Sequence, residues 1–403
     1  MKGLSAIFLV FILCLGCKRQ DKPSESKDNI FTKSTFEAEG VDKQSIDLLL
    51  RQVSEKEFGH VDRILLLKNG KLILDNLTQV DYKSISKGKS SSLGCGYQTC
   101  EDSTAFGEYN YYHPTWHPYY KNKEIHTLQS ITKSISSLLI GIAIDQNKIP
   151  GTDALIIDYL TDYDLSRVEE SLKRATLSHL LKMKLGMRWY EIGTPDTDPN
   201  NNTFALEQSE DWVQYTLNQP MDTLPDTDWV YNSGASQLMS VIIQKATGLD
   251  LDEYAKKYLF EPLGIIDYHW KRTPKGYPDA LGGLYLKAED LAKIGQLVLN
   301  KGLWGNQQLV SSEWIEESTS RLSDKTQVLD FGYGYQWWRP DLEGVNVIAG
   351  LGYGGQSLII IPEFNLVGVT FSWNVFGNEF KDIRVSIIRS MVESQKLLIE
   401  EEK

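Results

Sequence analysis

Apolar residues follow two different spacings along the chain. Near the N-terminal end, residues 64–67 and 72–74 are apolar runs joined through Asn69-Gly70, a pair that favours a tight hairpin turn. Near the C-terminal end, "SLIIIPEFNLVGVTFSW" predicts a second hairpin that turns at residues 362–365, and the short run 345–349 predicts another strand before it. We therefore expect strands near both ends of the chain.

Between these strand regions the apolar spacing becomes helical. One helix is marked by Leu177, Leu180 and Leu181, the next by Leu238, Ile242 and Ile243 before Gly248, a third by Leu291, Ile294 and Leu297, and a last one by Ile383, Ile387, Ile388 and Met391. The pattern predicts an α+β fold, in which both chain ends form one antiparallel sheet flanked by helices. A mostly helical subdomain, about 130–265, is inserted into a domain of residues 41–395, and a cleft is expected where sheet and subdomain meet.

The segment "LQSITKSISSLLIGIA" places Ser130 and Lys133 three residues apart at the head of an apolar helical stripe. The same Ser-x-x-Lys spacing begins at Ser24, Ser84 and Ser86, where the sequence is polar and rich in turn residues, so the spacing alone carries little information. Residues three apart share a helix face. A buried lysine has a lowered pKa and can take the serine proton, which makes serine a nucleophile. The alternative is a serine that caps the helix before an exposed lysine; the apolar surroundings favour catalysis.

Two further segments complete a candidate site. In "DWVYNSGASQLMSVIIQKATG", Tyr231 precedes a helix and could carry a proton, with Ser233 on its side and Asn232 directed elsewhere; a half-buried packing role is the alternative. In "AGLGYGGQSLIII", the glycines permit close approach of backbone to a ligand, and a strand N–H there could form an oxyanion hole with the N–H of Ser130. A turn without function is the alternative for this segment.

Composition limits the class of partner. The 403 residues are 41% hydrophobic and 24% charged, with a formal charge of -12 and no basic stripe, which argues against nucleic-acid binding. Residues 1–16 have a basic start and an apolar stretch too short for a membrane span, so they are expected to be a signal peptide. The ending "CLGC" resembles a bacterial lipoprotein box with Cys17 as the lipidated residue, and residues 17–40 would be its linker; a plain secretory signal is the alternative. We expect an exported protein that is lipid-anchored at the cell envelope.

Cys95 and Cys100 are expected to form a disulfide outside the cytoplasm, with free thiols as the alternative. Their loop, 84–124, is long enough to be a lid over the cleft or a plain exposed loop. His113 and His117 are separated by proline, and residues 196–207 lack the glycine of a calcium loop, so no metal site is expected.

These segments, in this order, resemble the serine beta-lactamase-related family from about residue 60 to residue 375. The family includes class C beta-lactamases, DD-peptidases, family VIII esterases and 6-aminohexanoate-dimer hydrolase. "SITKS" matches its nucleophile motif and "YNS" its Tyr-x-Asn motif. The resemblance implies that Ser130 is acylated, Lys133 is the base and Tyr231 carries the proton. It also implies an oxyanion hole from Ser130 and Tyr353, and no cofactor. It places the substrate-binding residues at Ser233, Gly352, Gly354, Gly355 and Gln356.

Two departures from the family pattern affect substrate choice. Ser233 stands where beta-lactamases have Asn, and Gly350-Leu351-Gly352 stands where they have a Lys-Thr-Gly motif whose lysine helps to bind a substrate carboxylate. We therefore predict a serine hydrolase for a small ester, amide or peptide substrate. A beta-lactamase or cell-wall DD-peptidase is one alternative, and a non-catalytic ligand-binding lipoprotein of the same fold is the other.

Overall fold

The computed structural model describes residues 31–78, 80–81, 85, 124–194, 198–328, 331–342, 344–375 and 381–401, with side chains of the last helix described as far as residue 395. All of them belong to the unit Phe31–Lys403. Cys17, Cys95, Cys100 and the loop around the two latter residues lie outside the described residues, so the signal, anchor and disulfide remain predictions. Among the described helices, none combines the length and apolarity that crossing a bilayer requires.

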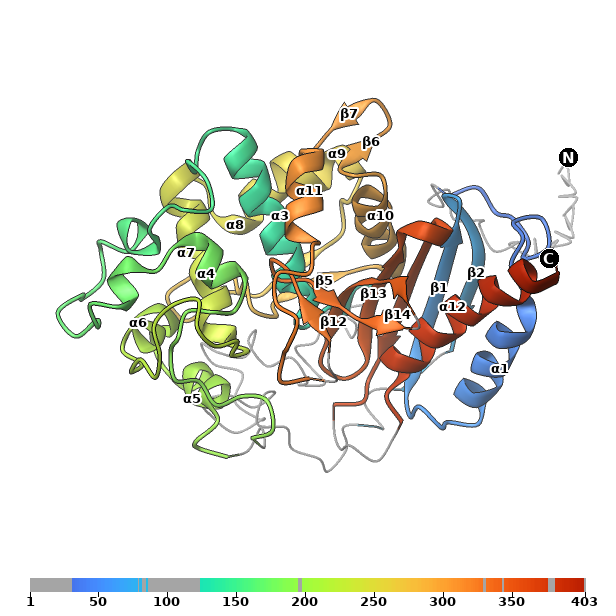
Figure 1. Ribbon diagram of the computed structural model, residues 1–403, viewed down its shortest axis with the longest axis horizontal. Coiled ribbons are helices and arrows are strands. Elements are labelled where there is room, and N and C mark those ends of the chain that lie inside the picture. The colour runs from blue at the N-terminus through green and yellow to red at the C-terminus, as the bar shows by residue number, and fades with distance from the viewer. Residues whose placement is uncertain are drawn as a thin grey trace, which may run out of the picture. The chain divides into compact units, whose positions relative to one another are not determined.

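A seven-stranded sheet is built from segments near both ends of the chain (Figure 1). Its strands are β1 (Val61–Lys68), β2 (Lys71–Leu77), β8 (Gly332–Tyr333), β9 (Trp338–Arg339), β12 (Ile348–Gly352), β13 (Gln356–Ile361) and β14 (Leu366–Ser372). Their order is β2-β1-β14-β13-β12-β9-β8, and every neighbouring pair is antiparallel. The α+β class and the sheet formed by both chain ends are thus confirmed.

Both predicted hairpins are present. β1 and β2 pair up to Lys68 opposite Lys71, and Asn69 and Gly70 adopt φ values of 52° and 73°, which the tight turn requires. β13 and β14 turn through the short helix Pro362–Phe364. The single strand predicted over 345–349 is wrong in its bounds. The chain forms β11 (Val345–Asn346), which pairs with β10 (Asp341–Leu342), and only then enters the main sheet at Ile348.

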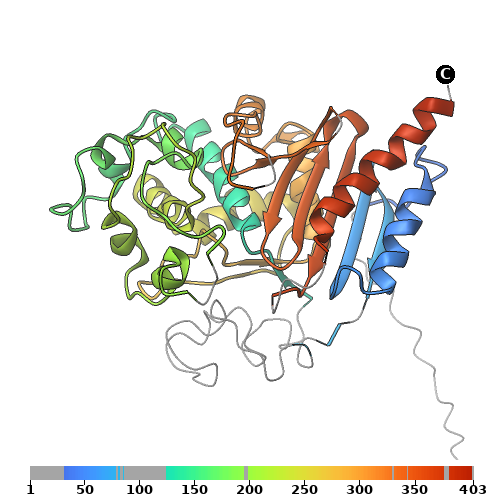
Figure 2. The same cartoon turned by 60° about the horizontal axis from the view of Figure 1, so that its bottom comes forward.

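The strands bury both faces, because successive side chains point to opposite sides of the sheet. Ile64 and Leu66 pack in the cluster that α1 (Lys43–Ser54) and α12 (Ile383–Glu401) cover, where these two helices lie side by side (Figure 2). Leu65 and Leu67 pack in the larger cluster shared with α3 (Ile131–Asp145) and α10 (Ala288–Leu299). The helix that carries Ser130 and Lys133 therefore contributes to the core on one face of the sheet.

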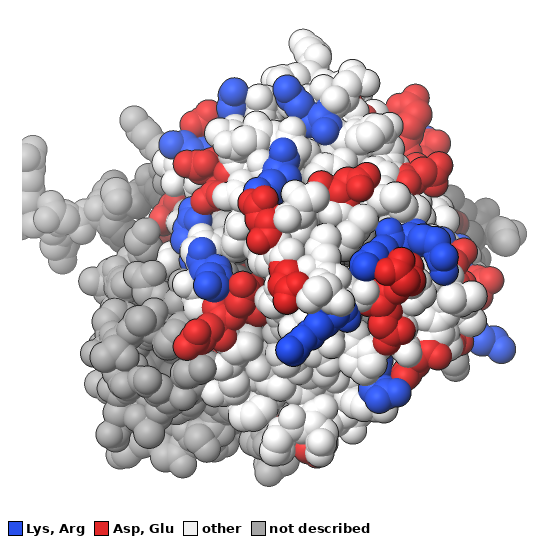
Figure 3. Space-filling model, turned by 90° about the vertical axis from the view of Figure 1, so that its left-hand side faces the viewer, with Lys and Arg blue, Asp and Glu red and all other residues white. Residues whose placement is uncertain are grey.

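Helices dominate the chain between residues 131 and 263, as the sequence predicts. They are α3, α4 (Leu177–Leu181), α5 (Asn202–Glu207), α6 (Trp212–Leu217), α7 (Ser233–Thr247), α8 (Leu251–Ala255) and α9 (Glu261–Leu263). α3 and α7 are the most buried and pack against each other, and α7 ends at Gly248 with a φ of 77°. Acidic and basic side chains are interspersed on the outer surface of this helical region (Figure 3).

Shorter elements connect the helical region with the sheet. A three-stranded sheet joins β3 (His126–Thr127), β5 (Leu284–Leu286) and β4 (His269–Trp270), in the order β3-β5-β4. Because β3 directly precedes α3, this small sheet fixes the entry to the helix that begins after Ser130. Further short elements include β6 (Leu303–Trp304), β7 (Gln307–Gln308) and α11 (Ser312–Ser318).

Candidate active site

Ser130 occupies the N-cap position of α3, but its side chain makes no capping hydrogen bond. A capping serine normally accepts a hydrogen bond from a backbone N–H of the first turn. The preceding residue, Gln129, has a φ of 50°, a left-handed conformation that costs energy for a residue other than glycine. The hydroxyl of Ser130 instead lines a pocket of about 510 Å³. The strained backbone at Gln129 thus accompanies a serine that faces the pocket rather than its own helix.

Lys133 lies one turn further along α3 and is 1% exposed. Its Nζ is 2.9 Å from the Oγ of Ser130 and donates a 2.6 Å hydrogen bond to the carbonyl of Leu281. Burial lowers the pKa of Lys133 to about 8, although the carboxylates of Glu191, Asp279 and Glu207 act in the opposite direction. Near neutral pH a useful fraction of this amine is therefore uncharged and able to accept a proton.

Tyr231 reaches the same hydroxyl from the segment before α7. Burial raises the pKa of Tyr231 above its ordinary value, and a side-chain hydrogen bond with Ser130 opposes this shift. The Nζ of Lys133 lies 5.1 Å from the centroid of the Tyr231 ring. The ring itself stacks on Trp338, with the centroids 5.7 Å apart, and contacts Trp229. The structure therefore brings Ser130, Lys133 and Tyr231 together and holds the phenol in its protonated form.

The start of α7 separates the two residues that follow Tyr231. Asn232 is buried and caps α7 by accepting a 2.8 Å hydrogen bond from the N–H of Ala235. Ser233 lines the pocket, and its hydroxyl and N–H donate hydrogen bonds of 2.7 and 3.0 Å to the two carboxylate oxygens of Glu191. Ser233 thus shares the pocket with Tyr231, while Asn232 points into the protein.

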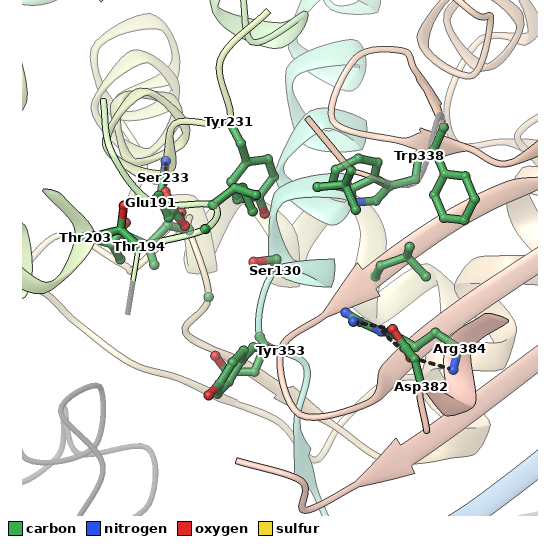
Figure 4. Close-up of a pocket in the computed structure, with 18 of the residues that line it drawn as sticks. Ser130, Glu191, Thr194, Thr203, Tyr231, Ser233, Trp338, Tyr353, Asp382 and Arg384 are labelled. Carbon is green, nitrogen blue, oxygen red and sulfur yellow. Dashed lines mark hydrogen bonds and ion pairs between the residues drawn. The ribbon is translucent and has the colours of Figure 1, made fainter. Parts of the chain in front are cut away.

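The pocket has two chemically different sides (Figure 4). Glu191, Thr194, Thr203 and Ser233 lie on one side of Ser130, and Trp338, Asp382 and Arg384 lie on the other. Asn201 and Glu207 add polar groups to the lining, and Val328, Phe331 and Leu351 add apolar side chains that share a cluster with Trp338. The pocket therefore offers both polar and apolar surface around Ser130.

Only part of the predicted glycine segment reaches the pocket. Tyr353 lines it, but Gly352, Gly354 and Gly355 are not among the described residues of its lining. Gly354 and Gly355 form the turn between β12 and β13 with φ values of 80° and 99°. Gly352 packs against the backbone just before Ser130, since a Cβ there would overlap the carbonyl of Leu128. These glycines permit close packing around the site without lining its cavity.

The prediction that Gln356 binds substrate is wrong. Its side chain is fully buried, donates a 2.6 Å hydrogen bond to the carbonyl of Ser372 and accepts a 3.0 Å hydrogen bond from the N–H of Ser372. It also donates to the carbonyl of Tyr353. Gln356 therefore ties the β12–β13 turn to β14, because a buried amide needs partners for both its donor and its acceptor.

Three parts of the site were not predicted from the sequence. Glu191 lies in no recognised motif, two residues after Trp189, and a backbone carbonyl such as that of Leu281 has no sequence signature. Arg384 and Asp382 come from the start of α12, form a 2.7 Å ion pair, and Arg384 also donates a 3.2 Å hydrogen bond to the carbonyl of Gly352. The segment "GMRWYE" offered the one usable signal, a carboxylate next to a tryptophan whose N–H it accepts at 2.9 Å.

His126, which lies four residues before Ser130, and the possible calcium segment have structural roles. His126 is 2% exposed, stacks on Phe371, contacts the tilted ring of Trp373, and lies 3.9 Å from the carboxylate of Asp62. In the possible calcium segment, Asn201 caps α5, while residues 195–197 lie outside the described part of the chain. Within the described residues no group of three or more His, Cys, Asp or Glu side chains gathers as a metal site would.

Comparisons with known proteins show which proteins the chain resembles. The chain is 25% identical over 266 residues to 6-aminohexanoate-dimer hydrolase of Paenarthrobacter ureafaciens, which covers 61% of this chain and 66% of that protein. It is 22% identical over 274 residues to Penicillin-binding protein 4* of Bacillus subtilis (strain 168), covering 60% and 58%. These matches thus leave a third or more of each relative unmatched.

The structure of EstCE1, described as a hydrolase with promiscuous acyltransferase activity, superposes with a TM-score of 0.61 and covers 87% of this chain and 97% of that one at 14% identity. At that identity the superposition shows the shared fold alone. The family model named Beta-lactamase matches residues 109–388, which is more than half of the chain and contains Ser130, Lys133 and Tyr231. The chain therefore belongs to the beta-lactamase family.

Proposed function

We propose that the protein is a serine hydrolase that cleaves an ester or amide through an acyl-enzyme on Ser130. One observation carries this proposal: the Lys133 amine, buried and with its pKa lowered to about 8, lies 2.9 Å from the Ser130 hydroxyl. In its uncharged form the amine has a lone pair that can accept the serine proton. Membership in a family with hydrolase relatives supports the same conclusion.

In the proposed acylation step, the Oγ of Ser130 attacks the substrate carbonyl carbon while its proton moves to the Nζ of Lys133. The carbonyl π electrons move to oxygen, and the N–H groups of Ser130 and Tyr353 are proposed to stabilise that charge. The bond to the leaving group then breaks, and Tyr231 donates its phenolic proton to the departing oxygen or nitrogen. The Lys133 ammonium returns a proton to Tyr231, and water later attacks the acyl-enzyme by the reverse proton route.

The pocket supports a substrate that carries no carboxylate. A Cβ at Gly350 would lie 3.1 Å from Ile131 of α3, so the position that holds a lysine in the family motif faces a packed helix here. Leu351 presents an apolar side chain to the pocket. Among the described lining residues the one Lys or Arg side chain is Arg384, and Asp382 neutralises it, whereas Glu191 and Glu207 add negative charge. A carboxylate would therefore enter a site of unfavourable potential.

A beta-lactamase or DD-peptidase activity is the alternative that the similarity to Penicillin-binding protein 4* favours. Turnover of a butyrate ester and of nitrocefin by the wild type and by Ser130→Ala separates the two functions. We expect ester turnover that the substitution abolishes, and no nitrocefin turnover. Nitrocefin turnover that depends on Ser130, with no turnover of the ester, would establish the alternative.

We further propose that the protein is exported and anchored through a lipid on Cys17, by the sequence of its first 17 residues. Labelled fatty acid supplied to cells that express the full chain tests this. Incorporation that is lost in Cys17→Ser supports a lipoprotein, while release of the unlabelled wild type into the soluble exported fraction supports the plain signal peptide.

A further inference from the structure

Lys133 depends on a backbone carbonyl from a distant loop. Its Nζ forms hydrogen bonds with the Oγ of Ser130 at 2.9 Å and with the carbonyl of Leu281 at 2.6 Å. Leu281 lies in the segment between β4 and β5, about 150 residues further along the chain. The direction of the lysine amine toward the serine therefore depends on what fixes this segment.

An aspartate holds the segment in shape. The Oδ1 of Asp279 accepts hydrogen bonds from the N–H groups of Leu281 and Gly282, both at 3.0 Å. Asp279 is fully buried, and its Oδ2 lies 3.7 Å from the Nζ of Lys271, which is 1% exposed. An aspartate that accepts hydrogen bonds from the N–H groups two and three residues later stabilises a turn. Because Asp279 is buried, water does not compete for these hydrogen bonds.

Neighbouring elements clamp the same segment. Gln237 of α7 accepts the N–H of Ala280 at 2.9 Å and donates to the carbonyl of Pro278 at 3.0 Å. At Gly283, a Cβ would lie 2.6 Å from the Cβ of Asp279, so no side chain fits there. The segment therefore has little freedom once the aspartate is in place.

We propose that the buried Asp279–Lys271 pair positions the Lys133 amine against Ser130, by fixing the segment whose Leu281 carbonyl accepts the hydrogen bond from that amine. Asp279 and Lys271 are positioning residues, since neither lines the pocket. This inference rests on the proposed hydrolase function. It adds the residues outside the pocket that determine the position of the Lys133 amine. A purely structural pair would not need to be ionic, because a buried ion pair is rarely better for stability than apolar side chains.

Charge gives the pair a second effect on the same amine. The carboxylates that act on Lys133 are Glu191, Asp279 and Glu207, and each raises its pKa against the effect of burial. Removing the negative charge of Asp279 while keeping its acceptor oxygen should therefore move the protonation of Lys133 to lower pH. Removing the acceptor as well should loosen the carbonyl and misplace the amine.

The test is the rate at which a fluorophosphonate probe labels the full chain, measured from pH 6 to pH 10. We expect Asp279→Ala to lower the labelling rate about tenfold or more at every pH, because small displacements of a catalytic group are costly. Asp279→Asn retains an acceptor for both N–H groups, so its labelling rate at high pH should be close to that of the wild type. The pH range over which its labelling rate rises, the acid limb of the profile, should lie lower than in the wild type. Asp279→Asn combined with Lys271→Met removes both charges, whose effects on the pKa of Lys133 oppose each other, so this variant should fold and show a smaller shift than Asp279→Asn.

The matched control is a second buried Asp–Lys pair, Asp290 and Lys293 on α10, whose charged atoms lie 2.7 Å apart. Asp290→Ala and Asp290→Asn should lower thermal stability without changing the labelling rate or its pH limb. Wild-type rates and an unmoved limb in folded Asp279→Ala, or an unmoved limb in folded Asp279→Asn, would overturn the inference. A wild type that the probe does not label would instead overturn the proposed function, so the two failures are distinguishable.

Discussion

The Nζ of Lys133 lies 5.1 Å from the centroid of the Tyr231 ring, and burial moves the pKa values of the two groups in opposite directions. The amine becomes easier to deprotonate and the phenol harder. Both groups adjoin the hydroxyl of Ser130. This arrangement divides the proposed work between them, with Lys133 as the base and Tyr231 as a proton donor that stays neutral.

The first prediction concerns pH. Because the pKa of Lys133 is about 8 and its uncharged form is the proposed base, the rate of Ser130 acylation should rise with pH up to about pH 8 and then level off. The pKa of Tyr231 is raised, so no loss is expected below about pH 10. Stopped-flow labelling by a fluorophosphonate measures the profile. A limb near pH 6 would assign the base to another group, and Lys133→Arg, which stays protonated, should remove the activity.

The second prediction is that Lys133 lowers stability. Its pKa is about 8 in the folded protein and 10.5 as the ordinary value, a difference worth about 3 kcal/mol. The folded state binds the proton more weakly than the unfolded state, so the full loss of folding stability applies below about pH 8. This loss decreases as the pH rises from 8 and is gone above 10.5. Lys133→Met should therefore unfold at higher urea concentration than the wild type at pH 7, with the advantage shrinking by pH 10.

A matched lysine gives the control for this stability effect. Lys293 is also buried, but it pairs with Asp290 at 2.7 Å. Lys293→Met should reduce stability at pH 7, because it leaves a buried carboxylate without its partner. If Lys133→Met were as destabilising as Lys293→Met, the buried charge of Lys133 would not lower the stability of the folded protein, and the second prediction would be wrong.

The third prediction separates Tyr231 from its aromatic neighbours. Tyr231→Phe keeps the stacking on Trp338 but removes the proposed donor to the leaving group, so kcat for an ester should fall by about two to four orders of magnitude. The control is Tyr333→Phe, since Tyr333 is equally buried against Trp338 but does not line the pocket. Equal losses in both variants would indicate a packing role for Tyr231.

The fourth prediction tests the packing of the nucleophile helix. A Cβ at Gly141 of α3 would overlap the indole ring of Trp314, so Gly141→Ala should cost about 1–3 kcal/mol and lower the melting temperature. Ser137 of the same helix is buried, and its Oγ has no hydrogen-bond partner among the described residues. Ser137→Ala should thus be neutral or slightly stabilising. A neutral Gly141→Ala would show that α3 and α11 pack less tightly than the structure indicates.

Sequence patterns predicted those parts of the fold that depend on local chemistry. The Asn69-Gly70 turn and the helical stripe after Ser130 each need residues that are close in sequence, and both are present. The bounds of the strand around 345–349 were wrong because Val345 and Asn346 pair with a neighbouring segment first. A pattern of apolar residues does not say which partner a strand chooses.

The candidate site was predictable only where a motif names the residue. Ser130, Lys133 and Tyr231 come from three-to-five-residue motifs, and tertiary packing then brings them together. The carbonyl of Leu281 and the side chain of Arg384 reach the site through long-range contacts that no local pattern encodes. Gln356 was misassigned because its place beside a glycine turn indicates proximity to the site but not the direction of its side chain.

The most direct test of the central claim is intact mass after incubation with a fluorophosphonate. The wild type should gain one adduct, Ser130→Ala should gain none, and Ser84→Ala, which removes a serine with the same spacing to a lysine, should label like the wild type. No adduct on the folded wild type, or an adduct that persists in Ser130→Ala, would contradict a hydrolase that works through Ser130 and would favour a ligand-binding protein of the same fold.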